Sequence, residues 1–222
     1  MSPHYKNAMV AVDVILFTVV EGTLHTLVIE MKKDPFCGKL AFPGGLVQGG
    51  ESIEDAAHRH LKEKTGVSSA YLEQLYTFGN VDRDPFGRVV SVSYIGLIRP
   101  DVDSLNTTRD YGQVAWIPVN DLDEMAYDHD AMRVLALSRL RAKMGYTNIA
   151  FGLMPEKFTL SELQQTYENI LGKHIDKRNF RRKILSLGIL TSTGKRQMDV
   201  SNRPALLYTF THKRLVEADI LA

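Results

Sequence analysis

A chain of 222 residues and 25.0 kDa with 44% hydrophobic and 24% charged residues has an ordinary globular composition, which excludes collagen-like, coiled-coil and largely disordered proteins. Its length suits one large domain, or one medium and one small domain. The longest apolar stretch, Ala8–Val20, contains Asp13 and is shorter than the roughly 20 residues of a membrane helix, so we expect no membrane partner. The N-terminus lacks signal-peptide features, and Cys37 is the only cysteine. We therefore expect a cytoplasmic protein. The net charge of +1 hides an asymmetry, because residues 1–150 carry 15 Lys and Arg against 19 Asp and Glu whereas residues 151–222 carry 12 against 7, which indicates a basic C-terminal module that meets nucleic acid or an acidic surface.

The first half of the chain is predicted to be rich in strands. Ala8–Val20 and Leu24–Met31 are β-branched, apolar runs separated by Glu21-Gly22, which predicts an antiparallel hairpin. A helix is predicted over residues 52–65, with Ser52 as N-cap, Asp55 as its capping-box partner and Gly66 as C-cap. Further predicted elements are strands at Tyr76–Val81, Val89–Ile98 and Ala115–Pro118, a type I turn at residues 84–87 and a closing helix over residues 130–143.

Beyond Gly145 the pattern changes to two helices and a hairpin. Thr159 and Glu162 form a predicted capping box, and apolar residues then recur at helical spacing until Gly172. A second helix is predicted from Asp176 to Gly188. Two apolar runs, Ile189–Thr191 and Ala205–Phe210, flank a polar segment and predict a hairpin with a long tip. This order of elements is typical of a winged helix-turn-helix domain.

A long motif with fixed spacing lies in residues 42–67. The sequence there is FPGGLVQGGESIEDAAHRHLKEKTGV, which resembles the Nudix box, G-x5-E-x7-R-E-U-x-E-E-x-G-U with U a bulky apolar residue. A loop that leads into a capped helix is the context expected for this motif, and so many fixed positions make a chance match improbable. The matching positions are Gly45, Glu51, Arg59, Leu61, Glu63, Gly66 and Val67.

His60 and Lys64 depart from the Nudix pattern, since both replace glutamates of that box. In the family, three glutamates at spacings i, i+3 and i+4 share one helix face and hold Mg²⁺ or Mn²⁺ against a diphosphate. Only Glu63 remains of the three here, lysine brings positive charge to the place of the cation, and imidazole is a poor ligand for Mg²⁺. The resemblance therefore implies a phosphate-binding pocket that has lost catalysis and needs no cofactor, with Lys64 as a fixed counter-charge. In the alternative, Glu51, Glu63 and a carboxylate from elsewhere in the fold hold the metal of a working hydrolase.

Residues 77–94, TFGNVDRDPFGRVVSVSY, and residues 127–130 are similar to segments of Nudix domains that recognise ADP-ribose and of their regulator relatives. This resemblance implies that residues 77–94 line the ligand. Arg83 and Arg88 are candidates for phosphate contacts, with solvated charges beside a turn as the alternative. Phe86 and Tyr94 are candidates for stacking on adenine, with a place in the core as the alternative for Tyr94. The candidate ligand residues are Arg59, Glu63, Lys64, Arg83, Phe86 and Arg88.

The basic segment KHIDKRNFRRK, residues 173–183, has Lys or Arg at six of its eleven positions. On a helix that begins near Asp176, the face of Phe180 and Ile184 packs while the opposite face presents cations, as recognition helices do in the major groove. Asn179 either contacts adenine or takes the third position of the first turn for capping. A solvated helix face or a protein-interaction module is the alternative. The candidate DNA-binding residues are Lys173, Lys177, Arg178, Asn179, Arg181 and Arg182 on and before the helix, and Lys195, Arg196 and Arg203 in a wing whose tip holds the first two.

Over roughly residues 8–212 the chain is similar to the Nudix-related transcriptional regulators, repressors of bacterial NAD metabolism, most clearly in residues 155–184. The resemblance implies an α+β protein with a Nudix-type α/β/α sandwich and mixed sheet at residues 1–148, followed by a winged helix-turn-helix at residues 149–222. It also implies a homodimer that leaves a palindromic operator when ADP-ribose or a related NAD metabolite binds. An active ADP-ribose pyrophosphatase with an accessory domain and a regulator that senses a sugar phosphate are the alternatives.

Overall fold

The computed structural model describes residues 7–68, 70–99, 105–197 and 204–220. The chain divides into two compact units. The first unit contains the chain up to Ala136, except for Thr18–Leu24 and Ile98–Val102. The second unit contains these two segments together with the chain from Leu137 onward. In the described part of the chain, no helix combines the length and apolar character that a membrane crossing requires.

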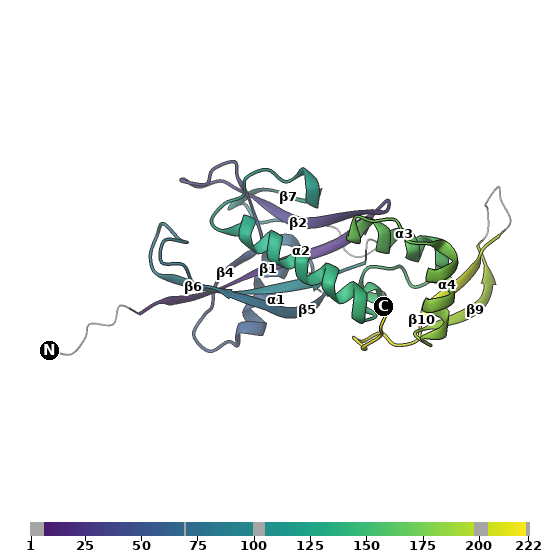
Figure 1. The fold of residues 1–222 in the computed structure, drawn as a ribbon. Coiled ribbons are helices and arrows are strands. Elements are labelled where there is room, and N and C mark those ends of the chain that lie inside the picture. Colours follow the sequence, from purple (N-terminus) through teal and green to yellow (C-terminus); the bar gives the residue numbers. More distant parts are fainter. Residues whose placement is uncertain (1–6, 69, 100–104, 198–203, 221–222) are drawn as a thin grey trace. The chain divides into compact units, whose positions relative to one another are not determined.

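The first unit is built on a seven-stranded mixed sheet. β1 is parallel to β6, while β5 on β6, β4 on β1 and β7 on β2 are antiparallel. β1 is buried along most of its length on both faces, so both faces of the sheet are covered. Figure 1 shows α2 across the face of the sheet that is turned toward the viewer. The elements are β1 Met9–Val20, β2 Thr23–Met31, β3 Leu40–Ala41, β4 Gly44–Leu46, α1 Ile53–Thr65, β5 Tyr71–Phe78, β6 Val89–Leu97, β7 Tyr111–Pro118 and α2 His129–Tyr146, with a 3-10 turn at Val119–Asp121. The predicted α/β/α sandwich with a mixed sheet is confirmed.

The turn between β1 and β2 has the geometry that a two-residue hairpin requires. Glu21 and Gly22 both have positive φ, 47° and 80°, as the two central positions of a type I′ turn do. The predicted caps of α1 are also present, because the Ser52 hydroxyl accepts from the Asp55 amide and Gly66 ends the helix in the left-handed region. The hairpin and the helix were therefore predictable from local sequence.

Several boundaries differ from those predicted. The fifth strand, β5, covers Tyr71–Phe78 and not Tyr76–Val81, because pairing with β6 fixes its extent and Val81 lies 71% exposed beyond Gly79. α2 continues through Gly145 to Tyr146, past the predicted end at residue 143. The short strands β3 and β4, in the glycine- and proline-rich loop before α1, were not predicted at all.

Beyond the last turns of α2, the second unit contains the helices of the helix-turn-helix and a three-stranded sheet of order β8-β10-β9. The Thr159–Glu162 capping box is present at the start of α3, and Asp176 caps α4. Lys195 and Arg196 lie in β9 and not at the hairpin tip, because β9 continues beyond the predicted end at Thr191 and pairs with β10 as far as Arg196. Arg203 lies outside the described residues. The elements are β8 Phe158–Thr159, α3 Leu160–Leu171, α4 Lys177–Ser186, β9 Leu190–Arg196 and β10 Leu206–Phe210, after a 3-10 turn at Ile149–Gly152.

Candidate functional site

A cavity of about 190 Å³ opens in the first unit. Its charged and polar lining comes from strand, loop and helix residues that are distant in sequence, and its aromatic lining from Phe42, Tyr111 and Tyr127. Tyr127 has a positive φ of 55°, which is uncommon for a non-glycine residue and concentrates at functional sites. The charged and polar side chains are Asp13 of β1, Lys64 of α1, Arg83 and Asp84 of the β5–β6 connection, and His129 of α2.

Asp13 is the buried carboxylate of this cavity. Its Oδ2 accepts a 2.6 Å hydrogen bond from the Ser91 hydroxyl, and its Oδ1 lies 3.5 Å from His129 Nε2. The Phe42 amide donates to His129 Nδ1 at 2.9 Å, so a neutral ring carries its proton on Nε2, the nitrogen that faces Asp13. Burial alone would raise the pKa of Asp13, but His129, Ser91 and Arg83 together hold that pKa below its ordinary value. Asp13 is therefore ionised in the folded protein.

Arg83 joins the β5–β6 connection to the start of α2. Its Nε and Nη2 donate to the two carboxylate oxygens of Asp128 at 3.0 and 2.8 Å, and Nη2 also lies 3.4 Å from Asp13 Oδ2. The guanidinium is nearly inaccessible, with 3% of the side chain exposed. Two carboxylates balance its charge, which a buried guanidinium requires.

Glu51, Arg59 and Glu63, which match the Nudix box, form a second ion-pair group. Arg59 binds Glu51 through Nε and Nη2 at 2.9 and 2.6 Å, and its Nη1 lies 3.3 Å from Glu63 Oε2. The hydrogen bonds from Arg59 lower the pKa of Glu51 to about 2. Both carboxylates of the motif are thus engaged with one arginine.

His60 and Lys64 occupy the positions of the missing glutamates and bind backbone oxygens. His60 Nε2 lies 3.0 Å from the Leu46 carbonyl, and Lys64 Nζ donates to the Gly44 carbonyl. The His60 ring packs so closely on Gly45 that a Cβ there would lie 2.6 Å from His60 Cε1. Burial lowers the pKa of His60, so its ring is neutral near neutral pH.

These residues do not fit a divalent cation of the Nudix kind. A hard cation needs several carboxylate or carbonyl oxygens with room between them, whereas a lysine ammonium and a neutral imidazole point at this loop. Among the residues that the structure describes, no three His, Cys, Asp or Glu side chains are grouped so that they could hold a metal. The Lys64 ammonium instead lies in the cavity wall, at a position where the motif has a metal-binding glutamate.

Two of the six candidate ligand residues line the cavity, and the other four lie outside its lining. Lys64 and Arg83 line the cavity together. Arg59 and Glu63 lie on α1 outside its lining, Phe86 is 68% exposed, and Arg88 donates to the Asn80 carbonyl. Tyr94, the other stacking candidate, is buried in the core with 3% exposure, as its alternative predicted.

Asp13 and Tyr111 line the cavity but were not among the residues predicted from the sequence, whereas Tyr127 and His129 belong to the segment 127–130 that resembles ADP-ribose-recognising Nudix domains. Asp13 carried a usable signal, because a single acidic residue inside an otherwise apolar buried strand needs a polar partner. The two tyrosines become neighbours only through the fold. A neighbouring, more open hollow shares Arg83 and Tyr127 with the cavity and includes Phe36, whose ring centroid lies 4.2 Å from that of Tyr127.

The exposed face of α4 presents most of the predicted cations. Lys177, Arg178 and Arg182 are exposed, while Phe180 and Ile184 are buried. Arg181 is half-buried and donates to the Ser161 hydroxyl of α3, so it faces the packed side. Exposed cations of the predicted set that lie outside the helix are Lys173, Lys195 and Arg196.

Two polar residues fix the first turn and the approach of α4. Asp176 is the N-cap, and the backbone amide of Asn179, at the third position of the first turn as one alternative predicted, donates to the Asp176 carboxylate. The Asn179 side chain accepts from Arg182. Before it, the Glu168 carboxylate of α3 accepts from the Ile175 amide and from His174, both at 2.8 Å. The Ile175 hydrogen bond lowers the pKa of Glu168, so this carboxylate is ionised at neutral pH.

Comparison with known proteins matches both units. A NUDIX domain model covers residues 8–136, and a model of the NrtR DNA-binding winged helix domain covers residues 150–210. The chain is 36% identical over 212 residues to the ADPR responsive transcriptional repressor NtrR of Acinetobacter baylyi, covering 93% of this chain and 83% of that protein.

Solved structures give the same pairing of domains. Shewanella oneidensis NrtR in complex with a 27mer DNA is 34% identical, with a TM-score of 0.77 over 91% of this chain and 93% of that one. The NUDIX domain of Shewanella oneidensis NrtR in complex with ADP ribose is 32% identical, with a TM-score of 0.57 over 63% of this chain and 93% of that one.

Proposed function

Because this chain belongs to the NrtR family, in which a NUDIX domain is joined to a DNA-binding winged helix, we propose that it is a transcriptional repressor that releases DNA when its Nudix unit binds ADP-ribose or a related NAD metabolite. The observation that carries this proposal is the presence in one chain of a lysine-lined Nudix cavity and an exposed basic helix. We place the domain boundary after residue 148 and the protein in the cytoplasm, where bacterial DNA is.

The effector cavity has the chemistry of a nucleoside diphosphate site. Lys64 already donates to Gly44 and has further N–H groups for phosphate oxygens, so it supplies the counter-charge that a metal supplies in a hydrolase. Tyr127 and Phe36 offer faces on which a purine can stack. Arg83 lines both the cavity that contains Lys64 and the neighbouring hollow that contains Phe36.

We also propose that this Nudix unit binds its ligand without hydrolysing it. His60 and Lys64 replace two of the three helix carboxylates, and the remaining Glu63 shares Arg59 with Glu51. A sensor that destroyed its own signal would report it poorly. The second candidate function is ADP-ribose pyrophosphatase activity, favoured by the retained Gly45, Glu51, Arg59 and Glu63 of the motif.

On the DNA side, α4 enters the major groove and the strands β9 and β10 lie beside the backbone. Lys177, Arg178, Asn179 and Arg182 then face the duplex. One such helix reads only a few base pairs, so we propose a homodimer that places two α4 helices on the half-sites of a palindromic operator.

A binding titration with a product assay separates these functions. Calorimetry with ADP-ribose and with ribose 5-phosphate, in chelator and then in Mg²⁺, measures affinity, while chromatography of the same samples measures AMP. We expect ADP-ribose to bind in chelator and to remain intact in Mg²⁺. Steady AMP release in Mg²⁺ would establish the hydrolase instead, and tighter binding of the sugar phosphate would establish a sugar-phosphate sensor.

A further inference from the structure

α2 is one continuous helix of 18 residues whose first turn is fixed at the cavity. Asp128, directly before it, is held by Arg83, and His129, its first residue, is held by Phe42 and Asp13. Arg83 and His129 both line the cavity. A phosphate group beside Arg83 competes with Asp128 for the same N–H donors, so a bound ligand acts directly on the groups that hold this turn.

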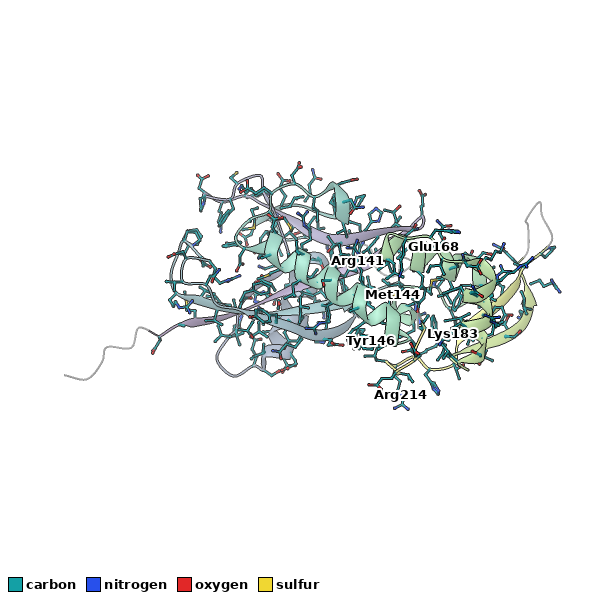
Figure 2. All side chains as sticks on the ribbon, in the orientation of Figure 1. Arg141, Met144, Tyr146, Glu168, Lys183 and Arg214 are labelled. Carbon is teal, nitrogen blue, oxygen red and sulfur yellow. The ribbon has the colours of Figure 1, made fainter. Side chains whose placement is uncertain are left out.

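The other end of α2 is bonded to the helix-turn-helix. Arg141 Nε donates a 2.8 Å hydrogen bond to the carbonyl of Ile170, in the last turn of α3, where helix carbonyls lack partners within the helix. Figure 2 labels Arg141, Met144 and Tyr146 on these last turns of α2, with Glu168 on α3 and Lys183 on α4. Met144 is fully buried, so this end of α2 is packed as well as hydrogen-bonded.

The C-terminal segment 216–220 makes a second connection from α2. The amides of Ala218 and Ile220 donate to the carbonyls of Tyr146 and Gly145 at 2.9 and 2.8 Å. Ala218 and Ile220 are buried, while the Asp219 carboxylate between them lies 3.7 Å from Lys183 Nζ of α4. The segment therefore lies along the end of α2 and reaches the basic helix.

We infer that Arg141 is a positioning residue that fixes the helix-turn-helix to α2, so that a displacement of the first turn of α2 by the effector moves α4. This inference rests on the proposed function, because it concerns how occupancy of the cavity reaches the DNA-binding helix. α2, α3 and the C-terminal segment move as one body when these contacts hold. Without the Arg141 bond the cavity still binds its ligand and α4 still binds DNA, but the two events are less coupled.

A different connection could serve the same purpose. The Asn169 amide of α3 donates to the carbonyl of Gly22 in the β1–β2 turn, and β1 also carries Asp13. Like Arg141, Asn169 is an exposed helix residue whose side chain donates to a backbone carbonyl. Asn169→Ala is therefore the matched control for the connection through α2.

The experiment measures the affinity of the full-length protein for a duplex from its own upstream region, with and without saturating ADP-ribose. The ratio of the two dissociation constants is the coupling factor. Arg141→Met removes the donor, whereas Arg141→Gln keeps an N–H at the position of Nε, and both residues favour helix. We expect R141M to lower the coupling factor about 2- to 30-fold, with R141Q and N169A close to wild type. We expect ADP-ribose affinity of the DNA-free protein to be unchanged in all three.

The outcomes separate the inference from the proposed function. A wild-type coupling factor of one contradicts the proposed function and the inference with it. If the wild-type coupling factor is large, three results overturn the inference and leave the proposed function standing. R141M keeps the wild-type factor, or R141Q loses as much of it as R141M does. In the third, N169A lowers the factor as much as R141M does.

Discussion

The ammonium of Lys64 lies 4.7 Å from the centroid of the Tyr111 ring while it donates to the Gly44 carbonyl. The aromatic face and the carbonyl both favour a positive charge at this point. A Nudix hydrolase has a metal-binding glutamate at the corresponding position of its motif. The cavity thus has the Lys64 ammonium where the family pattern has a carboxylate that binds a metal cation.

Replacing Lys64 should weaken effector binding and leave DNA binding intact. A charge-assisted contact to phosphate contributes about 1.5 to 3 kcal/mol, so we expect Lys64→Met to raise the dissociation constant for ADP-ribose about 10- to 150-fold. Calorimetry measures this change. Lys62→Met, at an exposed position on the same helix, is the control, and equal losses in the two variants would exclude a direct role for Lys64.

Restoring the two glutamates should create the missing chemistry. The double variant His60→Glu/Lys64→Glu places three acidic side chains on one face of α1 with Glu63. We expect Mg²⁺-dependent release of AMP from ADP-ribose that the wild type lacks, measured by chromatography with a chelator control. A wild type that already turns over, and gains little from the reversions, would show that the metal is held by other residues.

The protonation of His60 should make stability depend on pH. Burial lowers the pKa of His60 below its ordinary value of 6.5. As the pH falls through 6.5 the unfolded state takes up a proton that the folded state does not, so stability is lost from there down to the lowered pKa of the folded protein. Urea midpoints at about pH 7.5 and about pH 5.5 measure the loss. His60→Gln should show a smaller difference between the two, and an undiminished difference would exclude His60 as a source.

The exposed cations of α4 should determine the salt dependence of DNA binding. We expect Lys177→Ala to weaken binding on specific and unrelated duplexes alike and to reduce the slope of log K against log salt by about 0.9, the value for one phosphate contact. Lys213→Ala, which removes a 65% exposed lysine outside this helix, is the control. If the slope of K177A equals that of the wild type, Lys177 does not contact phosphate.

The sequence predicted those parts of the fold that local chemistry determines. The Glu21-Gly22 turn, the Ser52 cap and the Thr159–Glu162 capping box each depend on a few adjacent residues, and each was predicted correctly. The extent of β5 was predicted wrongly, because pairing with β6 and not its own composition decides where it begins.

The candidate site likewise has features that local sequence predicts and features that depend on the fold. The replacements at His60 and Lys64 are visible in the motif, because the spacing of that motif is fixed. The Asp13–Arg83–Asp128 group joins residues 45 to 115 positions apart, from a strand, a loop and the start of a helix that only the fold brings together. The predicted cations of α4 were visible as a cluster, but the inward contact of Arg181 with Ser161 depends on how α3 packs.

Fluorescence anisotropy on DNA from the protein's own upstream region, over a salt series and with and without ADP-ribose, shows whether the protein is an ADP-ribose-responsive DNA-binding regulator. We expect specific DNA binding whose affinity falls steeply with salt, and we expect ADP-ribose to release the DNA. Binding that is absent, or that ADP-ribose leaves unchanged, would contradict this function.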